Sequence, residues 1–220
     1  MSADAEGGGA PLRSLLAALE RRWGAAAFVK LRVSSVLVAG CGGLGSNVAL
    51  CLARAGIGFL ALYDFDQVEA ANLDRQLFFA DQVGRFKAEA LAENVRRVGA
   101  GTEVATFTVR IEEWNVEAAI ASADVVVEAF DNPSAKALLV AAAVAAGKTI
   151  VAASGVAGLC GASFPRIRLI GGRMALVGDE RNEVSDSLPA VSSRVSACAA
   201  LQADLTLQWI TEGRFGKNGN

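Results

Sequence analysis

Short apolar runs alternate along the chain with longer segments in which apolar residues recur at helical spacing. The runs are rich in branched side chains and end at glycines or charged residues, as buried strands do. Expected strands cover residues 36–38, 59–63, 103–109, 124–129 and 149–153. Expected helices cover residues 12–28, a segment ending at Ala55, 87–98, 116–121 and 133–146.

This alternation predicts an α/β fold of Rossmann-like type, with a mostly parallel sheet and helices on both faces. The last third differs from the rest. Residues 162–169 and 173–177 read as strands on either side of Gly171-Gly172, which predicts an antiparallel hairpin. A final helix is expected over residues 192–210.

Composition is consistent with one folded domain. The chain has 220 residues, of which 53% are apolar, so a disordered body is excluded. We expect a flexible N-terminus at 1–11, a single domain at 12–211 and a flexible tail at 212–220. The acidic, glycine-rich start lacks a signal-peptide pattern, and the longest apolar run, 137–146, is too short to span a bilayer. These features predict a cytoplasmic protein with no membrane partner.

Charge, histidine and cysteine content exclude several classes of function. A net charge of −2 argues against a nucleic-acid partner. Histidine is absent, which rules out an imidazole base and most zinc hydrolases. The four cysteines contain no CxxC pair, so no zinc is expected and reduced thiols are favoured. Packing in the interior is expected for Cys51 and Cys198, whereas a reactive Cys160 stays an open alternative.

The most informative stretch is the glycine-rich turn after the first strand. Gly40, Gly42 and Gly45 form a GxGxxG pattern that opens a helix, and the next strand ends at Asp64. The acid lies about 20 residues past the turn, as a nucleotide-binding βαβ unit requires. Such a turn lets the backbone approach phosphates, and the helix N-terminus attracts anions. The sequence therefore predicts nucleotide binding.

Further polar residues follow the ends of the expected strands. They are Asp64, Asp66, Asn72, Arg75, Gln76, Lys87 and Asp131. Ligands bind at the carboxyl ends of the strands in open α/β sheets. Basic groups suit phosphates and a carboxylate suits Mg²⁺, so the set favours a nucleoside triphosphate with its metal. Each residue taken alone could equally be a solvated loop residue.

The motifs GCGGLGS, DFDQVEAANLDRQ, a lysine at 87 and a strand followed by Asp131-Asn132 together resemble the ThiF/MoeB/HesA family. The resemblance covers roughly residues 30 to 210, and the phrases VAASGVAGLCG and SSRVSACAALQAD look most like the short ThiF branch linked to thiamine synthesis. It implies an adenylyltransferase that activates the C-terminal glycine of a small ubiquitin-like sulfur carrier protein ending in Gly-Gly. It also implies ATP and Mg²⁺, and a homodimer.

The resemblance implies a role for each matching position. The turn glycines Gly40, Gly42, Gly43 and Gly45 would approach the phosphates, with Gly43 meeting them through its backbone, and Asp64 would bind the ribose beside Asp66. The triphosphate would be held by Asn72, Arg75, Gln76 and Lys87, and Asp131 would bind Mg²⁺ with Asn132 beside it. Arg75, Lys87 and Asp131 would be the catalytic residues. An arginine lent to a partner's site would be Arg13, Arg21 or Arg22.

The sequence departs from the family pattern in two places. It lacks the paired CxxC zinc motifs of many relatives, and residues 178–193 lack a cysteine for thioester or persulfide transfer.

Three rival functions share parts of the same pattern. An NAD-dependent oxidoreductase would fit the glycine turn and Asp64, but it does not account for Arg75, Lys87 and Asp131. A non-catalytic module that docks a carrier protein would use the same fold without turning the carrier over. A tRNA-modifying dehydratase is conceivable within the family, although neither the charge nor any basic extension favours tRNA.

Overall fold

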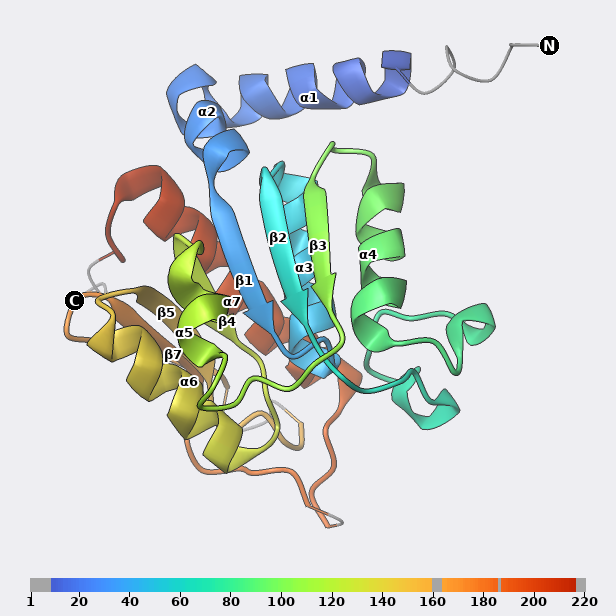
Figure 1. Cartoon of the computed structure of the whole chain (residues 1–220), viewed down its shortest axis with the longest axis vertical. Helices are drawn as coiled ribbons and strands as arrows, with labels where there is room; N and C mark the ends of the chain where they lie inside the picture. The colour runs from blue at the N-terminus through green and yellow to red at the C-terminus, as the bar shows by residue number, and fades with distance from the viewer. Residues whose placement is uncertain (1–8, 160–163, 186, 217–220) are drawn as a thin grey trace.

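The computed structural model describes residues 9–159, 164–185 and 187–216, and it shows one sheet covered by helices (Figure 1). The seven strands are β1 (Ser35–Ala39), β2 (Phe59–Tyr63), β3 (Glu103–Phe107), β4 (Val125–Glu128), β5 (Thr149–Ala153), β6 (Arg166–Ile170) and β7 (Met174–Gly178). Their order across the sheet is β3-β2-β1-β4-β5-β7-β6. The expected α/β class is confirmed.

All neighbouring strands run parallel except the last pair. β1 pairs with β2 and β4, and β5 pairs with β7, in parallel registers. β6 and β7 form the expected antiparallel hairpin, with Ile170 opposite Met174 across the Gly171-Gly172 turn. The described part of the first hairpin strand begins at Arg166, and residues 160–163 lie outside the described chain.

The sheet buries alternate residues on its two faces. Val36 and Val38 of β1 face a core made with α3 (Gly43–Ala55), α4 (Lys87–Val98) and α7 (Ser192–Glu212). Leu37 and Ala39 face a second core made with α5 (Val116–Ala121) and α6 (Pro133–Ala145). This period of two is what a strand buried on both sides requires. The expected helix limits at Ala55, Val98 and Ala121 agree with the structure.

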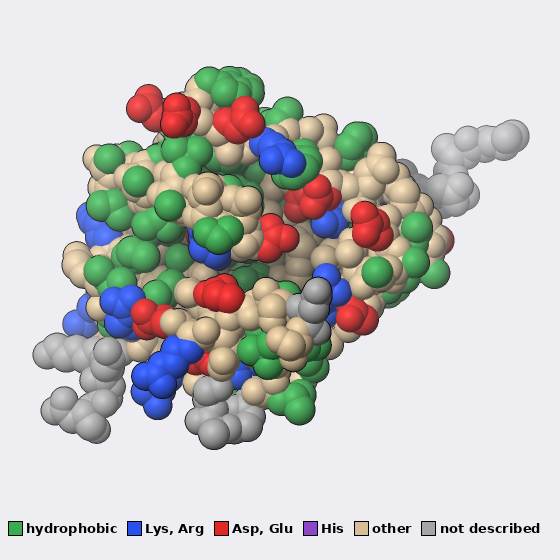
Figure 2. All heavy atoms as spheres, turned by 90° about the horizontal axis from the view of Figure 1, so that it is seen from below, with side chains coloured by type: hydrophobic (Ala, Val, Ile, Leu, Met, Phe, Trp, Pro, Cys, Tyr) green, Lys and Arg blue, Asp and Glu red, His purple; other side chains and the backbone are tan. Residues whose placement is uncertain are grey.

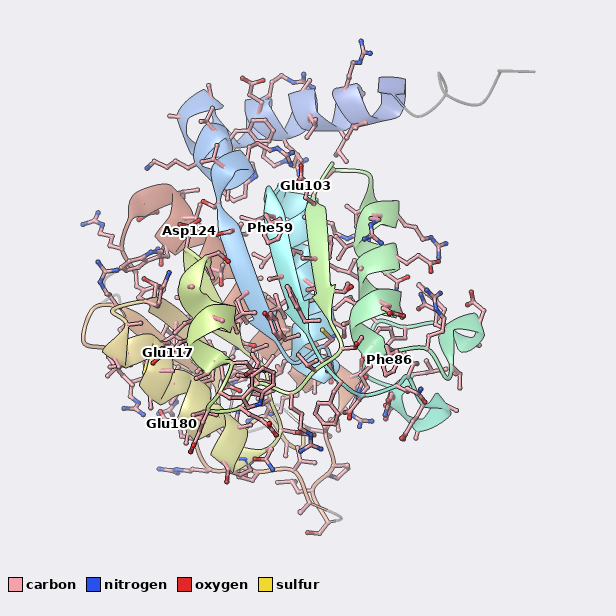
Figure 3. All side chains as sticks on the ribbon, in the orientation of Figure 1. Phe59, Phe86, Glu103, Glu117, Asp124 and Glu180 are labelled. Atoms are coloured by element: carbon pink, nitrogen blue, oxygen red, sulfur yellow. The ribbon has the colours of Figure 1, made fainter. Side chains whose placement is uncertain are left out.

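The N-terminal segment differs from the single helix expected over residues 12–28. It forms two helices, α1 (Gly9–Trp23) and α2 (Ala25–Val33), because Gly24 takes a φ of 77° that breaks the helix. α1 crosses the amino end of the sheet, where Figure 3 labels Glu103 and Asp124, and the opposite end carries Phe86 and Glu180. Near the C-terminus, Phe215 is buried against Trp209, within the range expected to be a tail.

Two short 3₁₀ turns, Ala70–Asn72 and Ala80–Gln82, shape the loop between β2 and α4. The strands after β1 are added first on one side of it, as β2 and β3, and then on the other side, as β4 and β5. The order of the strands therefore reverses between β1 and β4. Such a switch point opens a crevice at the carboxyl ends of the two strands. Among the described residues, no helix has both the length and the apolar character needed to cross a bilayer.

Candidate nucleotide site

The turn between β1 and α3 depends on two glycines that allow close backbone contact. Gly40 has a φ of 94°, a conformation that L side chains rarely adopt. A Cβ on Gly45 would lie 1.8 Å from the Gly40 carbonyl oxygen, so only glycine lets α3 begin against the turn. Gly42 and Gly43 line the cleft, as does Gly40, whereas Gly45 does not. Gly45 thus serves the packing of the turn alone, whereas the other glycines of the motif are open to a ligand.

Asp64 lies at the end of β2 with both carboxylate oxygens in use. Oδ2 accepts the N–H of Cys41 at 2.7 Å, and Oδ1 accepts the N–H of Asp66 at 2.8 Å. Burial raises the pKa of Asp64, and these two N–H donors oppose the shift. Burial of the Cys41 thiol, reinforced by the charge of Asp64, raises the pKa of that thiol well above its usual value. The acid therefore fixes the turn, and Asp64 is one of the residues that line the cleft.

The loop after β2 brings Arg75, Gln76 and Lys87 to the cleft. The Arg75 guanidinium is held 2.7 Å from Asp74 and donates to the carbonyl of Ala71. The ammonium of Lys87 lies 3.0 Å from Asp66. The carbonyl oxygen Oε1 of Gln76 is buried and has no hydrogen-bond partner among the described residues. Buried polar atoms without a partner are uncommon in folded proteins, and this one belongs to a residue that lines the cleft.

Asn72 occupies a different place from its neighbours. Its Oδ1 accepts the N–H of Glu69 at 3.1 Å, and the side chain closes the first 3₁₀ turn instead of lining the cleft. Gly45 also stays outside the lining, beneath the turn. Both residues stabilise the backbone that forms the site, without lining the cleft themselves.

Asp131 and Asn132 follow β4 and begin α6. Asn132 Oδ1 accepts the N–H groups of Ser134 and Ala135, each at 3.0 Å, so this side chain caps the helix. Proline follows at the first helical position, as expected. Asp131 is exposed, lines the cleft, and has no ion-pair partner among the described residues. Mg²⁺ is usually held by one or two carboxylates together with substrate phosphates, and Asp131 fits that role.

These elements enclose one cleft of about 1000 Å³. It opens at the carboxyl ends of the strands, where acidic and basic side chains surround a hollow (Figure 2). The structure brings together most of the residues singled out by sequence, and Gly45 and Asn72 lie behind the lining. The gathered set is Gly40, Gly42, Gly43, Asp64, Asp66, Arg75, Gln76, Lys87, Asp131 and Asn132.

The cleft is also lined by residues that were not singled out from the sequence. Arg110, after β3, lies over the ring of Phe65 at 3.9 Å, and both line the β2–β3 side. Lys136 of α6 lines the opposite side and pairs with the buried Glu128. A glutamate inside the run DVVVEA was the available signal, because a buried carboxylate is rarely left unpaired.

The cysteines and the N-terminal arginines stand apart from this cleft. Cys198 is buried as expected, but Cys51 is exposed, so the expectation of a buried Cys51 is wrong. The cause is position, since Cys51 falls on the outward side of α3 although its neighbours Leu52 and Ala53 are buried. Cys160 lies outside the described residues. Arg13, Arg21 and Arg22 are exposed on α1, at the far end of the sheet from the chain's own cleft.

Comparison with known proteins decides the family. The sequence model of the ThiF family matches residues 15–217. The chain belongs to the ThiF family. Among its curated relatives is the adenylyltransferase and sulfurtransferase MOCS3 of Aedes aegypti, 39% identical over 127 residues, which are 57% of this chain and 29% of the relative. MOCS3 of Mus musculus is 38% identical over 128 residues, 57% of this chain and 28% of the relative. This ThiF-family chain thus matches less than a third of the length of either relative.

Solved structures share the fold. The Escherichia coli tRNA N6-threonylcarbamoyladenosine dehydratase TcdA, in complex with ATP, superposes with a TM-score of 0.82 at 22% identity, over 90% of this chain and 94% of that one. Escherichia coli MccB with ATP gives a TM-score of 0.66 at 24% identity, over 86% and 58%. These likenesses establish a ThiF-type fold for the chain.

Proposed function

We propose that this chain is an ATP-dependent adenylyltransferase. The observation that carries the proposal is the convergence of Arg75, Lys87 and Asp131 on one cleft with the glycine turn. Two cations and an exposed carboxylate beside a phosphate-binding turn suit a triphosphate with its metal. The names of the relatives, and the ATP in the solved complexes of TcdA and MccB, support the same reaction class.

The substrate that we propose is the C-terminal carboxylate of a small ubiquitin-like carrier protein ending in Gly-Gly. In the reaction, a carboxylate oxygen bonds to the α-phosphorus of ATP, the bond from that phosphorus to the bridging oxygen breaks, and pyrophosphate leaves with the electron pair. The product is an acyl-adenylate. No general base is needed because the carboxylate is already ionised at neutral pH, which agrees with a chain that has no histidine.

The chain's own groups would align and stabilise this reaction. Asp64 would orient the ribose, and the backbone of Gly42 and Gly43 would face the phosphates. Arg75 and Lys87 would offset charge on the phosphates, each held in place by a neighbouring acid. Mg²⁺ would be held by Asp131 and would supply further neutralisation of the phosphate charge.

The type of carrier protein, its pathway and the oligomeric state of the chain are part of the same proposal. The carrier would be of the ThiS type and serve thiamine biosynthesis, which the resemblance of VAASGVAGLCG and SSRVSACAALQAD supports. The chain would act as a homodimer, because the exposed arginines of α1 lie far from its own cleft and would serve a partner's site.

Exchange of labelled pyrophosphate into ATP tests the function. Purified protein should catalyse exchange only when ATP, Mg²⁺ and a carrier ending in Gly-Gly are all present. A carrier shortened by its last glycine is the control and should support none. Binding of NAD in place of ATP would identify an oxidoreductase, and turnover of threonylcarbamoyladenosine in tRNA would identify a dehydratase. ATP and carrier binding without exchange would identify a docking module.

A further inference from the structure

Two strands of the sheet lack a covering helix on one of their faces. In Figure 1, α5 and α6 lie in front of β4 and β5, whereas no described helix lies in front of β2 and β3. The segment that joins β3 to α5 crosses this side of the sheet only at its carboxyl end. On the opposite side, α3 and α4 pack against the same strands. Part of one sheet face is therefore without a partner among the described residues.

Mostly apolar side chains occupy this uncovered area, which we call the β2–β3 face. The register of the two strands places six side chains on it, which are Phe59, Ala61, Tyr63, Glu103, Ala105 and Phe107. Phe59, Ala61 and Tyr63 contact the core on the side of α5 and α6, which identifies the face. The rings of Tyr63 and Phe107 stack with centroids 4.2 Å apart, and Phe107 is 37% exposed. A sheet buries its apolar face against another element, so this surface is suited to packing against a further protein.

Basic residues border the amino end of the β2–β3 face. α1 crosses the sheet at this end (Figure 1) and exposes three arginines, Arg13, Arg21 and Arg22, against one acid, Glu20. The helix therefore carries a net charge of +2. The end stays positive when Glu103 of β3 is counted with it.

Acidic residues border the carboxyl end of the same face. The segment 108–117 exposes Glu112, Glu113 and Glu117 against one base, Arg110, and so carries a net charge of −2. Trp114 lies among these acids, is 75% exposed, and donates from Nε1 to Oε2 of Glu112 at 2.9 Å. An exposed indole beside carboxylates suits the guanidinium of an arginine, which can stack on the ring and pair with the acid. The two ends of the face are therefore complementary in charge.

Two copies can place this face against itself in two simple ways. A two-fold axis along the strands would bring α1 against α1 and segment 108–117 against segment 108–117, which sets like charges together at both ends. A two-fold axis across the strands brings α1 of each copy against the 108–117 segment of the other, which sets +2 against −2 twice. Charge complementarity therefore selects the second arrangement.

We propose that the β2–β3 face is the surface through which two copies of this chain pack, with α1 of each copy on the 108–117 segment of its partner. The inference rests on the proposed function, because it names the interface of the homodimer proposed there. Glu112 and Glu113 line the cleft, so α1 of one copy reaches the rim of the partner's cleft. Arginines that lie far from their own cleft are thereby brought to that of the partner.

Phe107→Glu tests the face. The variant places a carboxylate and its symmetry copy in an area that must lose its water, so it should weaken dimerisation about 100-fold. Phe79→Glu is the matched control, because Phe79 is 54% exposed but lies in the loop before α4, outside the face. The control should change dimerisation by less than about threefold. Sedimentation equilibrium without ATP or carrier measures both. A wild type that stays monomeric, or a dimer that Phe107→Glu leaves intact, overturns the inference.

Charge reversal tests the orientation. Arg21→Glu/Arg22→Glu turns the net charge of α1 from +2 to −2, and Glu113→Arg/Glu117→Arg turns that of the segment from −2 to +2. Each double variant should dimerise at least about tenfold more weakly than wild type, because like charges then meet at both ends. All these substitutions in one chain, or an equimolar mixture of the two variants, should dimerise within about threefold of wild type. Native mass spectrometry identifies the mixed dimer, and failure of either rescue overturns this orientation.

The outcomes separate the interface from the activity. A dimer that shows this pattern but catalyses no pyrophosphate exchange supports the interface and rejects the adenylyltransferase proposal. Exchange by a wild type that stays monomeric keeps the activity and overturns the interface. If Phe107→Glu weakens binding of the carrier and leaves the oligomeric state unchanged, the face belongs to the carrier, which also overturns the inference. The reversal variants change only exposed side chains, so they decide the matter even if Phe107→Glu does not fold.

Discussion

Arg194 and Asp179 form an ion pair inside the protein, with Nη2 of Arg194 2.6 Å from Oδ2 of Asp179 and side chains 0% and 6% exposed. The guanidinium also donates to the carbonyl oxygens of Gly155 and Leu159, and Asp179 accepts the N–H groups of Arg181 and Asn182. Segments that follow β5 and β7 are thereby fastened to the start of α7. Gly155 and Glu183 of these segments line the cleft.

Breaking this pair should destabilise the whole domain. Arg194→Met leaves Asp179 buried without its cation, which should lower the free energy of unfolding by about 3–5 kcal/mol. Arg168→Met is the matched control, because Arg168 pairs with Glu180 at the surface and its removal should leave the melting temperature close to that of wild type. Urea unfolding of both variants measures the difference, and equal effects would contradict the importance of burial.

Substitution by alanine should have different effects at Gly45, which packs beneath the turn, and at Gly42, which lines the cleft. Gly45→Ala forces a Cβ into the Gly40 carbonyl oxygen, so it should cost about 3 kcal/mol of unfolding free energy. Gly42→Ala places its Cβ 3.7 Å from Gln76 Nε2, an ordinary contact, and should cost less stability while weakening ATP binding. Thermal unfolding and ATP titration together test the pair. A stable Gly45→Ala protein would show that the turn can relax.

Asp131 and Asn132 are adjacent but should have separate roles. Asp131→Asn should abolish adenylation and leave the melting temperature unchanged, because the exposed carboxylate serves the metal and not the fold. Asn132→Ala should lower the free energy of unfolding by about 1 kcal/mol through loss of the helix cap. Pyrophosphate exchange and thermal unfolding of both variants check this division. Exchange by Asp131→Asn within a few-fold of wild type would reject the metal assignment.

Arg75 and Lys87 should act on turnover more than on ATP affinity. If they stabilise charge that develops at the phosphates, each alanine variant should lower kcat about 100-fold with a smaller change in KM for ATP. Arg85→Ala is the control, because Arg85 pairs with Glu93 at the surface and lies outside the cleft lining. Steady-state kinetics decide the matter. A change confined to KM would make both residues ground-state binders.

A protein without Cys51, Cys160 and Cys198 should still form carrier adenylate. Cys51 is exposed on α3 and Cys198 is buried in α7, and residues 178–193 supply no thiol. Wild type should likewise accumulate no thiol-labile conjugate with the carrier. Cys41 is kept, since it lies in the phosphate turn. Mass spectrometry with and without reductant is the measurement, and a conjugate that survives denaturation but disappears with reductant would show covalent relay.

Local patterns predicted most of the fold because most of it is decided locally. Each of these signals acts within a few residues. Strands follow runs of branched side chains, glycines end the helices after Ala55 and Val98, and Asn132-Pro133 begins α6. The break at Gly24 was missed, since one glycine inside a helical pattern is often tolerated. Sequence could also place a cysteine on a helix without fixing the side that faces solvent, which is why Cys51 was assigned to the interior.

The site was predictable where it follows strand ends and unpredictable where it depends on contacts between distant segments. Arg75, Lys87 and Asp131 could be grouped because parallel strands share a carboxyl edge. Asn72 appeared equivalent to its neighbours, but its side chain closes a local turn. The partners of Glu128 and Arg194 lie on other elements, so no local spacing reveals them. Long-range pairing of this kind requires the folded chain.

The close approach of Gly45 to the Gly40 carbonyl has a thermodynamic consequence for ligand binding. With no space between α3 and the turn, the packing holds the backbone of the glycine turn in one conformation without a ligand. The conformational entropy of ordering it is therefore lost during folding and does not reduce the affinity for nucleotide.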